Sequence, residues 1–150
     1  MNIEIVPSEL RHVRELSLSI REKDQDEARA LGLAPHRGLH FAYTHATLRR
    51  TCLVDGSVAA MWGVCGTPLG VAGQPYLITG TVVNQISPVK FARIYIKEVE
   101  SMRNLFPVLE NYVHADYIGA VKMLQLAGFE LSDKLSINGS DFYRFSMRSE

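Results

Sequence analysis

The sequence predicts one α/β (α+β) domain, residues 1–150, in which a mixed central sheet of about seven strands is flanked by about four helices. Three observations lead to this prediction. The chain has 150 residues, the length of one ordinary domain. Short β-branched and aromatic runs alternate with longer amphipathic runs. These runs follow the order β-α-α-β-β-β-α-β-α-β-β, which intersperses strands and helices.

The composition narrows the class of partner. Sixteen Lys and Arg residues balance sixteen Asp and Glu residues, and 47% of the chain is hydrophobic. No apolar run approaches the roughly 20 residues that a membrane span needs. The first residues carry no basic-then-apolar secretory signal. We therefore expect a cytoplasmic protein with neither a nucleic-acid nor a membrane partner, in which Cys52 and Cys65 are buried and unpaired.

A strand and a helix open the chain. Ile3 and Ile5 alternate with polar residues, as in a half-buried strand. Pro7 ends this strand, and Ser8 suits the cap of the helix that follows. The inward positions of that helix are Leu10, Val13, Leu16 or Ser17, and Ile20.

An acidic cluster begins the next segment. Its members are Glu22, Asp24, Asp26 and Glu27. We predict that Asp24 caps a short helix and that Glu27 reaches back to complete a capping box, with Gly32 ending the helix. Such carboxylates could bind a metal ion. Interleaved basic residues and the favourable dipole at a helix start instead favour a solvated face, so we predict no metal site.

The segment from His36 to His45 is predicted to be helical. His36 and His40 have the i, i+4 spacing of zinc-binding helices, but no Glu or Cys accompanies them. This absence favours surface or groove histidines over a metal site.

The clearest hairpin follows. Thr51–Val54 and Val58–Cys65 flank Asp55-Gly56, the pair that a two-residue type I′ turn requires. Alternation places Trp62 on the same face as Val58, Ala60 and Val64, as a core residue rather than a ligand cage.

The glycine-containing segment from Gly66 to Gly73 is interpreted as a loop. It lacks the Lys-Ser/Thr pair of a phosphate-binding loop, which is the alternative. A strand is predicted at Tyr76–Thr79.

A long helix is predicted from Pro88 to about Leu105. Ser87 suits its cap, and Pro88 suits the first helical position because no N–H is needed there. The apolar stripe consists of Phe91, Ile94, Tyr95, Val99, Met102 and Phe106. The outward basic residues are either solvated or meet an acidic partner; they are Lys90, Arg93, Lys97 and Arg103.

The last third contains a strand, a helix and a hairpin. A strand is predicted at Val108–Val113, and Asp116 is placed to cap the helix that Gly128 ends. Leu124 and Phe129 are expected in the core. The two closing strands, Glu130–Leu135 and Asp141–Met147, are predicted to flank an Asn138-Gly139 turn.

The segment from Val108 to Phe129 resembles the C-terminal half of the GNAT N-acetyltransferase superfamily, where it reads roughly Asn-x-x-Ala-x-x-x-Tyr-x-x-x-Gly-Phe. Ala120, Gly128 and Phe129 match this pattern. Tyr117 stands at the Asn position, and Leu124 at the Tyr that often serves as general acid. The predicted element order matches the GNAT order along essentially the whole chain. The resemblance implies a ligand-binding splay between two central strands, bordered by the His36–His45 segment.

The resemblance also implies an acetyl-CoA site at the start of the long helix. GNAT enzymes hold the pyrophosphate with a Gln/Arg-x-x-Gly-x-Gly/Ala loop, but Thr81–Pro88 contains no glycine. The candidate cofactor-binding residues are Thr81, Val82, Val83, Gln85 and Ser87. Tyr117 and Tyr95 are the candidates for the missing catalytic acid, although packing roles are the alternative. We therefore expect a degenerate site and no bound cofactor.

A second resemblance, spread over the chain, is to the small internal-virion or assembly proteins of short-tailed bacteriophages. It rests on Glu27–Pro35, the Asp55-Gly56 hairpin, Tyr76–Thr79, Asn111–Asp116 and Asp141–Met147. It implies a protein of virion assembly in the host cytoplasm or packaged in the virion. Its partners would be phage or host proteins, with homo-oligomerisation left open. The alternative is an acetyl-CoA-dependent N-acetyltransferase with an atypical cofactor loop.

Overall fold

The computed structural model describes residues 1–67 and 69–149, which form one layered α/β unit. The strands are β1 (Ile3–Pro7), β2 (Ala46–Val54), β3 (Ser57–Gly66), β4 (Ala72–Thr79), β5 (Val108–His114), β6 (Glu130–Leu131), β7 (Leu135–Ile137) and β8 (Ser140–Arg148). The helices are α1 (Leu10–Ser17), α2 (Glu22–Ala30), α3 (Pro35–His45), the 3₁₀ helix η1 (Thr81–Gln85), α4 (Pro88–Arg103) and α5 (Ile118–Leu126). The predicted fold class is therefore confirmed, with one more strand and one more α-helix than expected in the described part.

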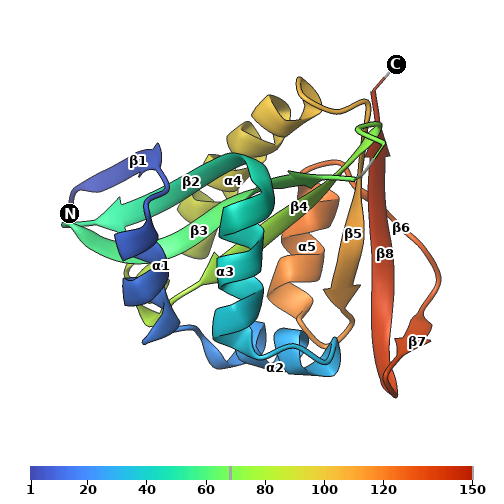
Figure 1. The fold of residues 1–150 in the computed structure, drawn as a ribbon, viewed down its shortest axis with the longest axis horizontal. Helices are drawn as coiled ribbons and strands as arrows, with labels where there is room; N and C mark the ends of the chain where they lie inside the picture. Colours follow the sequence, from blue (N-terminus) through green and yellow to red (C-terminus); the bar gives the residue numbers. More distant parts are fainter. Residues whose placement is uncertain (68, 150) are drawn as a thin grey trace.

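One mixed sheet organises these elements. Its strand order is β1-β2-β3-β4-β5-β8-β6, and β7 also pairs with β8. Neighbouring strands are antiparallel except β4 and β5, which run parallel and pair only at Ala72–Val108 and Gly73–Leu109. Beyond these pairs the two strands diverge toward their carboxyl ends (Figure 1). The predicted splay between two parallel central strands is confirmed.

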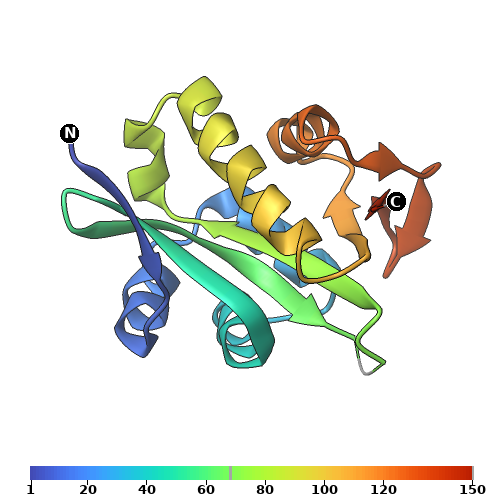
Figure 2. The same ribbon diagram turned by 90° about the horizontal axis from the view of Figure 1, so that it is seen from above.

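Helices cover both faces of the sheet. Helices α1 and α3 lie on one face and α4 and α5 on the other (Figure 2). Helix α2 lies near the carboxyl ends of β4 and β5 (Figure 1). The α4 and α5 side holds the larger core cluster, to which Trp62, Tyr95, Met102, Leu109 and Phe145 belong. No helix in the described part of the chain is long and apolar enough to cross a membrane.

The β2–β3 hairpin has the predicted turn and two unpredicted register shifts, one between Ala46 and Leu48 and one between Cys52 and Leu53. Asp55 and Gly56 have φ values of 49° and 83°, as a type I′ turn requires. The second shift arises because β3 carries one extra residue, Ala59, opposite the step from Cys52 to Leu53 of β2. Such a bulge reverses the alternation of side chains. Val58 therefore packs with the α1 and α3 cluster, and the prediction that it shares a face with Trp62 is wrong.

The start and apolar stripe of α4 are confirmed. The Ser87 hydroxyl accepts a hydrogen bond from the Lys90 N–H at 3.2 Å, and Pro88 occupies the first turn. Phe91, Tyr95 and Val99 are buried on one side of the helix. The helix ends at Arg103, slightly before the predicted end.

Several predicted boundaries are wrong. Strand β2 begins at Ala46, directly after α3, and β4 begins at Ala72, inside the predicted loop, whose residue Pro68 lies outside the described residues. Asp116 does not cap α5; Tyr117 occupies the cap position without a side-chain hydrogen bond. The predicted strand Glu130–Leu135 is divided into β6 and the start of β7.

The C-terminal end of α5 is built as predicted. Gly128 has φ 100°, and the Phe129 N–H donates to the Leu124 carbonyl at 3.0 Å. Leu124 and Phe129 are both buried. Cys52 and Cys65 are free, as predicted; Cys52 is buried and Cys65 half-buried.

Truncation of Leu124 to alanine is expected to lower the free energy of unfolding by roughly 2–5 kcal/mol, the range for deleting a buried leucine side chain. Leu124 is 5% exposed and packs in the main core, whereas Leu126 on the same helix is 73% exposed. Leu126→Ala is therefore the matched control and should change stability little. Urea denaturation measures both variants. Equal midpoints for the two would show that the assigned helix face is wrong.

Candidate functional site

Two carboxylates from α2 face the place where β4 and β5 diverge. Asp24 accepts hydrogen bonds from the Thr79 hydroxyl and, at 3.3 Å, from the Thr79 backbone N–H at the end of β4. Glu27 accepts one from the His114 backbone N–H, at the end of β5, at 2.9 Å. One helix thus connects both strand ends. We call this region, defined by Asp24, Glu27, Thr79, His114 and Tyr117, the β4–β5 junction.

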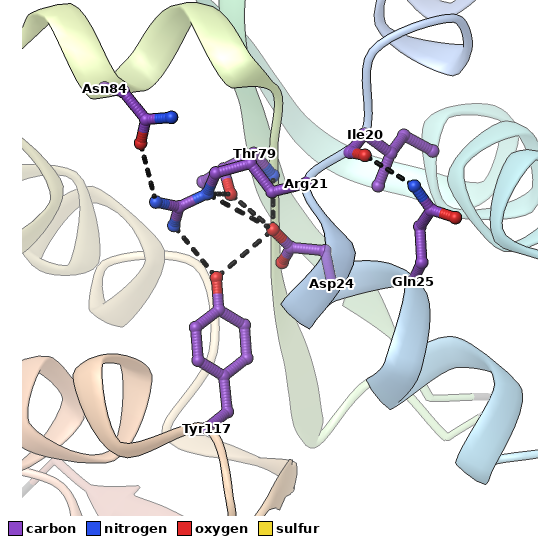
Figure 3. A network of polar contacts seen from close by, with 7 residues as sticks. All are labelled: Ile20, Arg21, Asp24, Gln25, Thr79, Asn84 and Tyr117. Atoms are coloured by element: carbon purple, nitrogen blue, oxygen red, sulfur yellow. Dashed lines mark hydrogen bonds and ion pairs between the residues drawn. The ribbon is translucent and has the colours of Figure 1, made fainter.

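A hydrogen-bond network joins four elements around Asp24 (Figure 3). The Tyr117 hydroxyl donates to Asp24 Oδ2 at 3.2 Å and accepts from Arg21 Nη2 at 3.0 Å. Arg21 also donates to Thr79 Oγ1 at 2.7 Å and to Asn84 Oδ1 at 3.3 Å. Because the Tyr117 hydroxyl both donates and accepts a hydrogen bond, the ring is held in one position at the start of α5.

Burial changes the protonation of this network. Burial raises the pKa of Asp24 to about 6, even though hydrogen bonds from Thr79 and Tyr117 and the charge of Arg21 act in the other direction. Burial likewise raises the pKa of Glu27 to about 7; the hydrogen bond from the His114 N–H acts against this rise, and the charge of the nearby Asp24 adds to it. Burial, with the charge of Asp24, also raises the pKa of Tyr117 to about 12, so the phenol is protonated near neutral pH. The junction therefore holds a proton acceptor and a proton donor at neutral pH.

The prediction of a solvated acidic face on α2 is wrong for two of its four members. The helix begins at Glu22, with Arg21 as its cap residue, so Asp24 cannot be the predicted cap. Asp24 is only 8% exposed, and Glu27 is half-buried. Asp24 and Glu27 are three residues apart and share one helix face. That spacing was visible in the sequence, but nothing local indicated that this face meets the sheet.

The two tyrosine candidates occupy different environments. Tyr117 lies in the junction. Tyr95 is 2% exposed and packs edge-on against Trp62, with ring centroids 5.9 Å apart, in the core under α4. The structure thus brings Tyr117, and not Tyr95, together with the Asp24 carboxylate of α2.

No metal site is formed in residues 1–67 and 69–149, where no three His, Cys, Asp or Glu side chains come together as a metal would require. His36 and His40 are both exposed on α3.

The candidate cofactor-binding residues lie in η1 and at the start of α4. Thr81 donates its N–H to the Ser19 carbonyl at 2.9 Å, and Val83 donates to the Gly80 carbonyl at 3.0 Å. The Val83 side chain is buried in the core, and Val82 packs against that core. Gln85 and Ser87 are exposed.

Some backbone donors at this helix start are already hydrogen-bonded. The Lys90 N–H bonds to the Ser87 hydroxyl, the Phe91 N–H to the Ser87 carbonyl, and Pro88 has none. The apolar side chains of Val83 and Ile86 point into the core rather than over this helix start. Engaged backbone donors are the main difference from a glycine-rich phosphate loop.

A basic groove lies beside the same helix start. It has a volume of about 380 Å³ and is lined by Ser87, Val89, Lys90, Arg93, Ile94 and Lys97. Three of the predicted outward cations line this groove, and all three are exposed as predicted. Phosphate groups could be bound here by side chains rather than by backbone N–H groups.

A larger open pocket adjoins the junction at His114. Its volume is about 640 Å³, and one face of α2, the end of β5 and the β7–β8 turn line it. The lining residues are Lys23, Asp26, Arg29, Ala30, Gly32, His114, Asp116, Asn138 and Ser140. The Asn138 amide donates to the Ala30 carbonyl at 3.3 Å and joins the β7–β8 turn to α2. Glu27 lies beside this pocket, because it bonds to the backbone of His114.

The buried carboxylates predict an unusual pH dependence of stability. A carboxyl group whose folded pKa exceeds its unfolded value binds its proton more tightly when folded. The free energy of unfolding should therefore fall as pH rises from about 4 to about 7. For Asp24, a change from 3.8 to about 6 corresponds to roughly 3 kcal/mol.

The double variant Asp24→Asn, Glu27→Gln should have a flatter stability profile over this range, because the amides can accept the same hydrogen bonds without ionising. Denaturant titrations at several pH values measure this, with the exposed Glu22→Gln as control. A wild-type stability that rises over the same range would contradict the assignment.

Comparisons with known proteins establish the fold. No protein-family model matches the sequence, and no curated protein matches it. Solved structures do match. An N-acetyltransferase from Staphylococcus aureus Mu50 has a TM-score of 0.71 at 12% identity, covering 99% of this chain and 98% of that one. A GNAT-family acetyltransferase from Bacillus anthracis has a TM-score of 0.71 at 5% identity, covering 99% and 95%.

Spermidine N-acetyltransferase from Vibrio cholerae, solved in complex with CoA and spermine, has a TM-score of 0.67 at 13% identity, covering 97% of this chain and 95% of that one. These structures are acetyltransferases, and nothing in the comparisons supports the resemblance to bacteriophage internal-virion proteins. At these identities the likeness concerns the fold alone. The chain has the GNAT N-acetyltransferase fold.

Proposed function

We propose that this protein transfers an acyl group from a CoA thioester to an amine. The observation that carries the proposal is the β4–β5 junction, where the half-buried Glu27 carboxylate and the protonated Tyr117 phenol lie at the carboxyl ends of two diverging parallel strands. Acyl transfer to an amine needs a group that accepts a proton and a group that donates one. The likeness to acetyltransferases, one of them solved with CoA, supports this reading over a role in virion assembly.

The residues present would bind a CoA thioester through side-chain cations and a free strand edge rather than through a glycine-rich loop. The basic groove at the start of α4 can hold phosphates with Lys90, Arg93 and Lys97 side chains. The diverging edge of β4 can pair with an extended amide-containing arm, because alternation turns the backbone groups of Leu77 to the same edge as those of Thr79. A bound CoA thioester would supply an activated acyl group at the junction.

The chain's own groups have separable roles. Glu27, with its pKa about 7, can take the proton of an amine near neutral pH. Tyr117 keeps its proton and can donate it to an anion that forms in the junction. Asp24 and Arg21 hold the Tyr117 hydroxyl in place and are positioning residues.

Calorimetric titration with acetyl-CoA, together with thiol release when amines are supplied, tests the proposal. We expect binding that weakens with salt, because side-chain cations carry it. A Lys90→Gln, Arg93→Gln double variant should bind at least about tenfold more weakly, since each charge-assisted hydrogen bond contributes roughly 1.5–3 kcal/mol. Lys122→Gln, exposed on α5, is the control for lost charge. No binding and no thiol release from the wild-type protein would overturn the proposal.

A second candidate is a non-enzymatic assembly or interaction protein on this fold. The engaged backbone donors at Thr81, Val83 and Lys90 favour it, because the N–H groups that would hold a pyrophosphate are already hydrogen-bonded. The specific form of this candidate is the role in bacteriophage assembly that the second sequence resemblance implies. The same titration separates the two, since this candidate requires no binding of acetyl-CoA.

A further inference from the structure

The acceptor of the proposed acyl transfer can be narrowed by the charges around the 640 Å³ pocket. We infer that this pocket takes a small zwitterion, a molecule of the α-amino acid class that carries an ammonium and a carboxylate group together. The inference rests on the proposed function for the reaction, but the binding site itself stands on the pocket.

The pocket carries two charges of each sign. Lys23 and Arg29 supply the positive charges, and Asp26 and Asp116 supply the negative ones. Within residues 1–67 and 69–149, no ion pair joins any of these four side chains to another group. Charges of both signs that remain unpaired around one concave surface can pair with a ligand of both signs.

The charges have an order across the pocket. Lys23, Asp26 and Arg29 are spaced i, i+3, i+6 along one face of α2, which forms one wall. Asp116 follows β5 on the other wall, beyond His114, whose N–H holds Glu27. An ammonium group between Asp26 and Asp116 would therefore lie near Glu27, the proposed proton acceptor. The ligand carboxylate would then be left for Arg29 or Lys23.

Arg29 is suited to bind that carboxylate. Its guanidinium donates to the Gln25 side-chain oxygen at 3.0 Å through one nitrogen, which orients the group and leaves other N–H donors free. A planar guanidinium can bind a carboxylate with two hydrogen bonds.

The balance of charge also argues against a polyamine. The four charged side chains of the lining sum to zero, so the lining has no excess of acidic groups that would favour a polycation. A zwitterion satisfies both kinds of group. The Vibrio cholerae enzyme of the same fold, by contrast, was solved with spermine.

The test is a binding measurement that needs no CoA. Pools of the proteinogenic amino acids are titrated into the ¹⁵N-labelled protein, and the backbone amide signals of His114 and Asp116 are followed. For each amino acid that binds, two matched analogues are compared: the amine that lacks the carboxylate, and the N-acetyl derivative that lacks the ammonium group. Both analogues are expected to bind at least about tenfold more weakly than the amino acid.

Two variants test which charged side chain binds which group of the ligand. Arg29→Gln should weaken binding of the amino acid about tenfold or more and leave binding of the decarboxylated amine unchanged. Asp116→Asn should weaken binding of both. Arg11→Gln, exposed on α1, is the control and should change neither.

Each result decides the inference. Failure of every amino-acid pool, equal binding of the decarboxylated amines, or tighter binding of spermidine would overturn it. If acetyl-CoA binds and no zwitterion does, the inference fails while the proposed function stands. If a zwitterion binds and acetyl-CoA does not, the proposed function fails and the pocket remains assigned.

Discussion

Replacement of Gly63 with alanine is expected to lower the free energy of unfolding by about 3 kcal/mol or more, at the severe end of overpacking substitutions. A β-carbon at this position would lie 2.0 Å from the Leu48 carbonyl oxygen and 2.9 Å from the Tyr76 hydroxyl. The first of these neighbours is backbone, so rotation of a side chain cannot relieve the clash. Strands β2 and β3 would have to move apart where Arg49 pairs with Gly63.

The matched control is Gly119→Ala in α5. A β-carbon at Gly119 meets no atom within 4 Å, and alanine favours the helix by up to about 1 kcal/mol over glycine. We therefore expect this variant to be as stable as the parent or slightly more stable. Urea denaturation followed by far-UV circular dichroism compares the two. A Gly63→Ala protein with the parental midpoint would show that the β2–β3 spacing is not as described.

Local sequence patterns predicted those parts of the fold that local physics determines. The Ser87-Pro88 start of α4, the Asp55-Gly56 turn and the Gly128 helix end each depend on a few neighbouring residues. All three occur as predicted. The order of the elements predicted a mixed sheet, and the resemblance to the GNAT superfamily implied that two of its central strands separate.

Features that depend on distant contacts were not predictable in this way. The extra residue Ala59 in β3 reverses the side-chain alternation, and no local pattern distinguishes it from a regular strand residue. The inward direction of Asp24 and Glu27 depends on how α2 meets β4 and β5. An acidic helix start is normally solvated, so the sequence favoured the wrong interpretation.

The sequence predicted only some of the residues of the junction. Tyr117 was a candidate because Leu124 replaces the tyrosine that often serves as general acid in GNAT enzymes. Its partners Arg21 and Asp24 lie 96 and 93 positions away, so only the folded chain places them together. In the cofactor loop, the sequence correctly showed that glycine is absent. The structure adds that the backbone donors of Thr81, Val83 and Lys90 are engaged by Ser19, Gly80 and Ser87.

Replacement of Glu27 with glutamine is expected to reduce the rate of the proposed acyl transfer by roughly 10²–10⁴-fold, the usual contribution of a general base. The glutamine carbonyl oxygen can still accept the His114 N–H, so the backbone of β5 should keep its position. The wild-type rate should rise through pH about 7 as Glu27 loses its proton.

The variant should lack this rise, and the ratio of the two rates should therefore increase with pH around neutrality. Thiol release from acetyl-CoA, measured for both proteins with the same amine, gives this ratio. The amine's own deprotonation affects both proteins equally and cancels in it. Glu22→Gln, exposed in the first turn of the same helix, should behave as the wild type. An unchanged rate in the Glu27→Gln variant, or a ratio that does not vary with pH, would show that Glu27 takes no part in the reaction. Its carboxylate would then serve only to join α2 to β5.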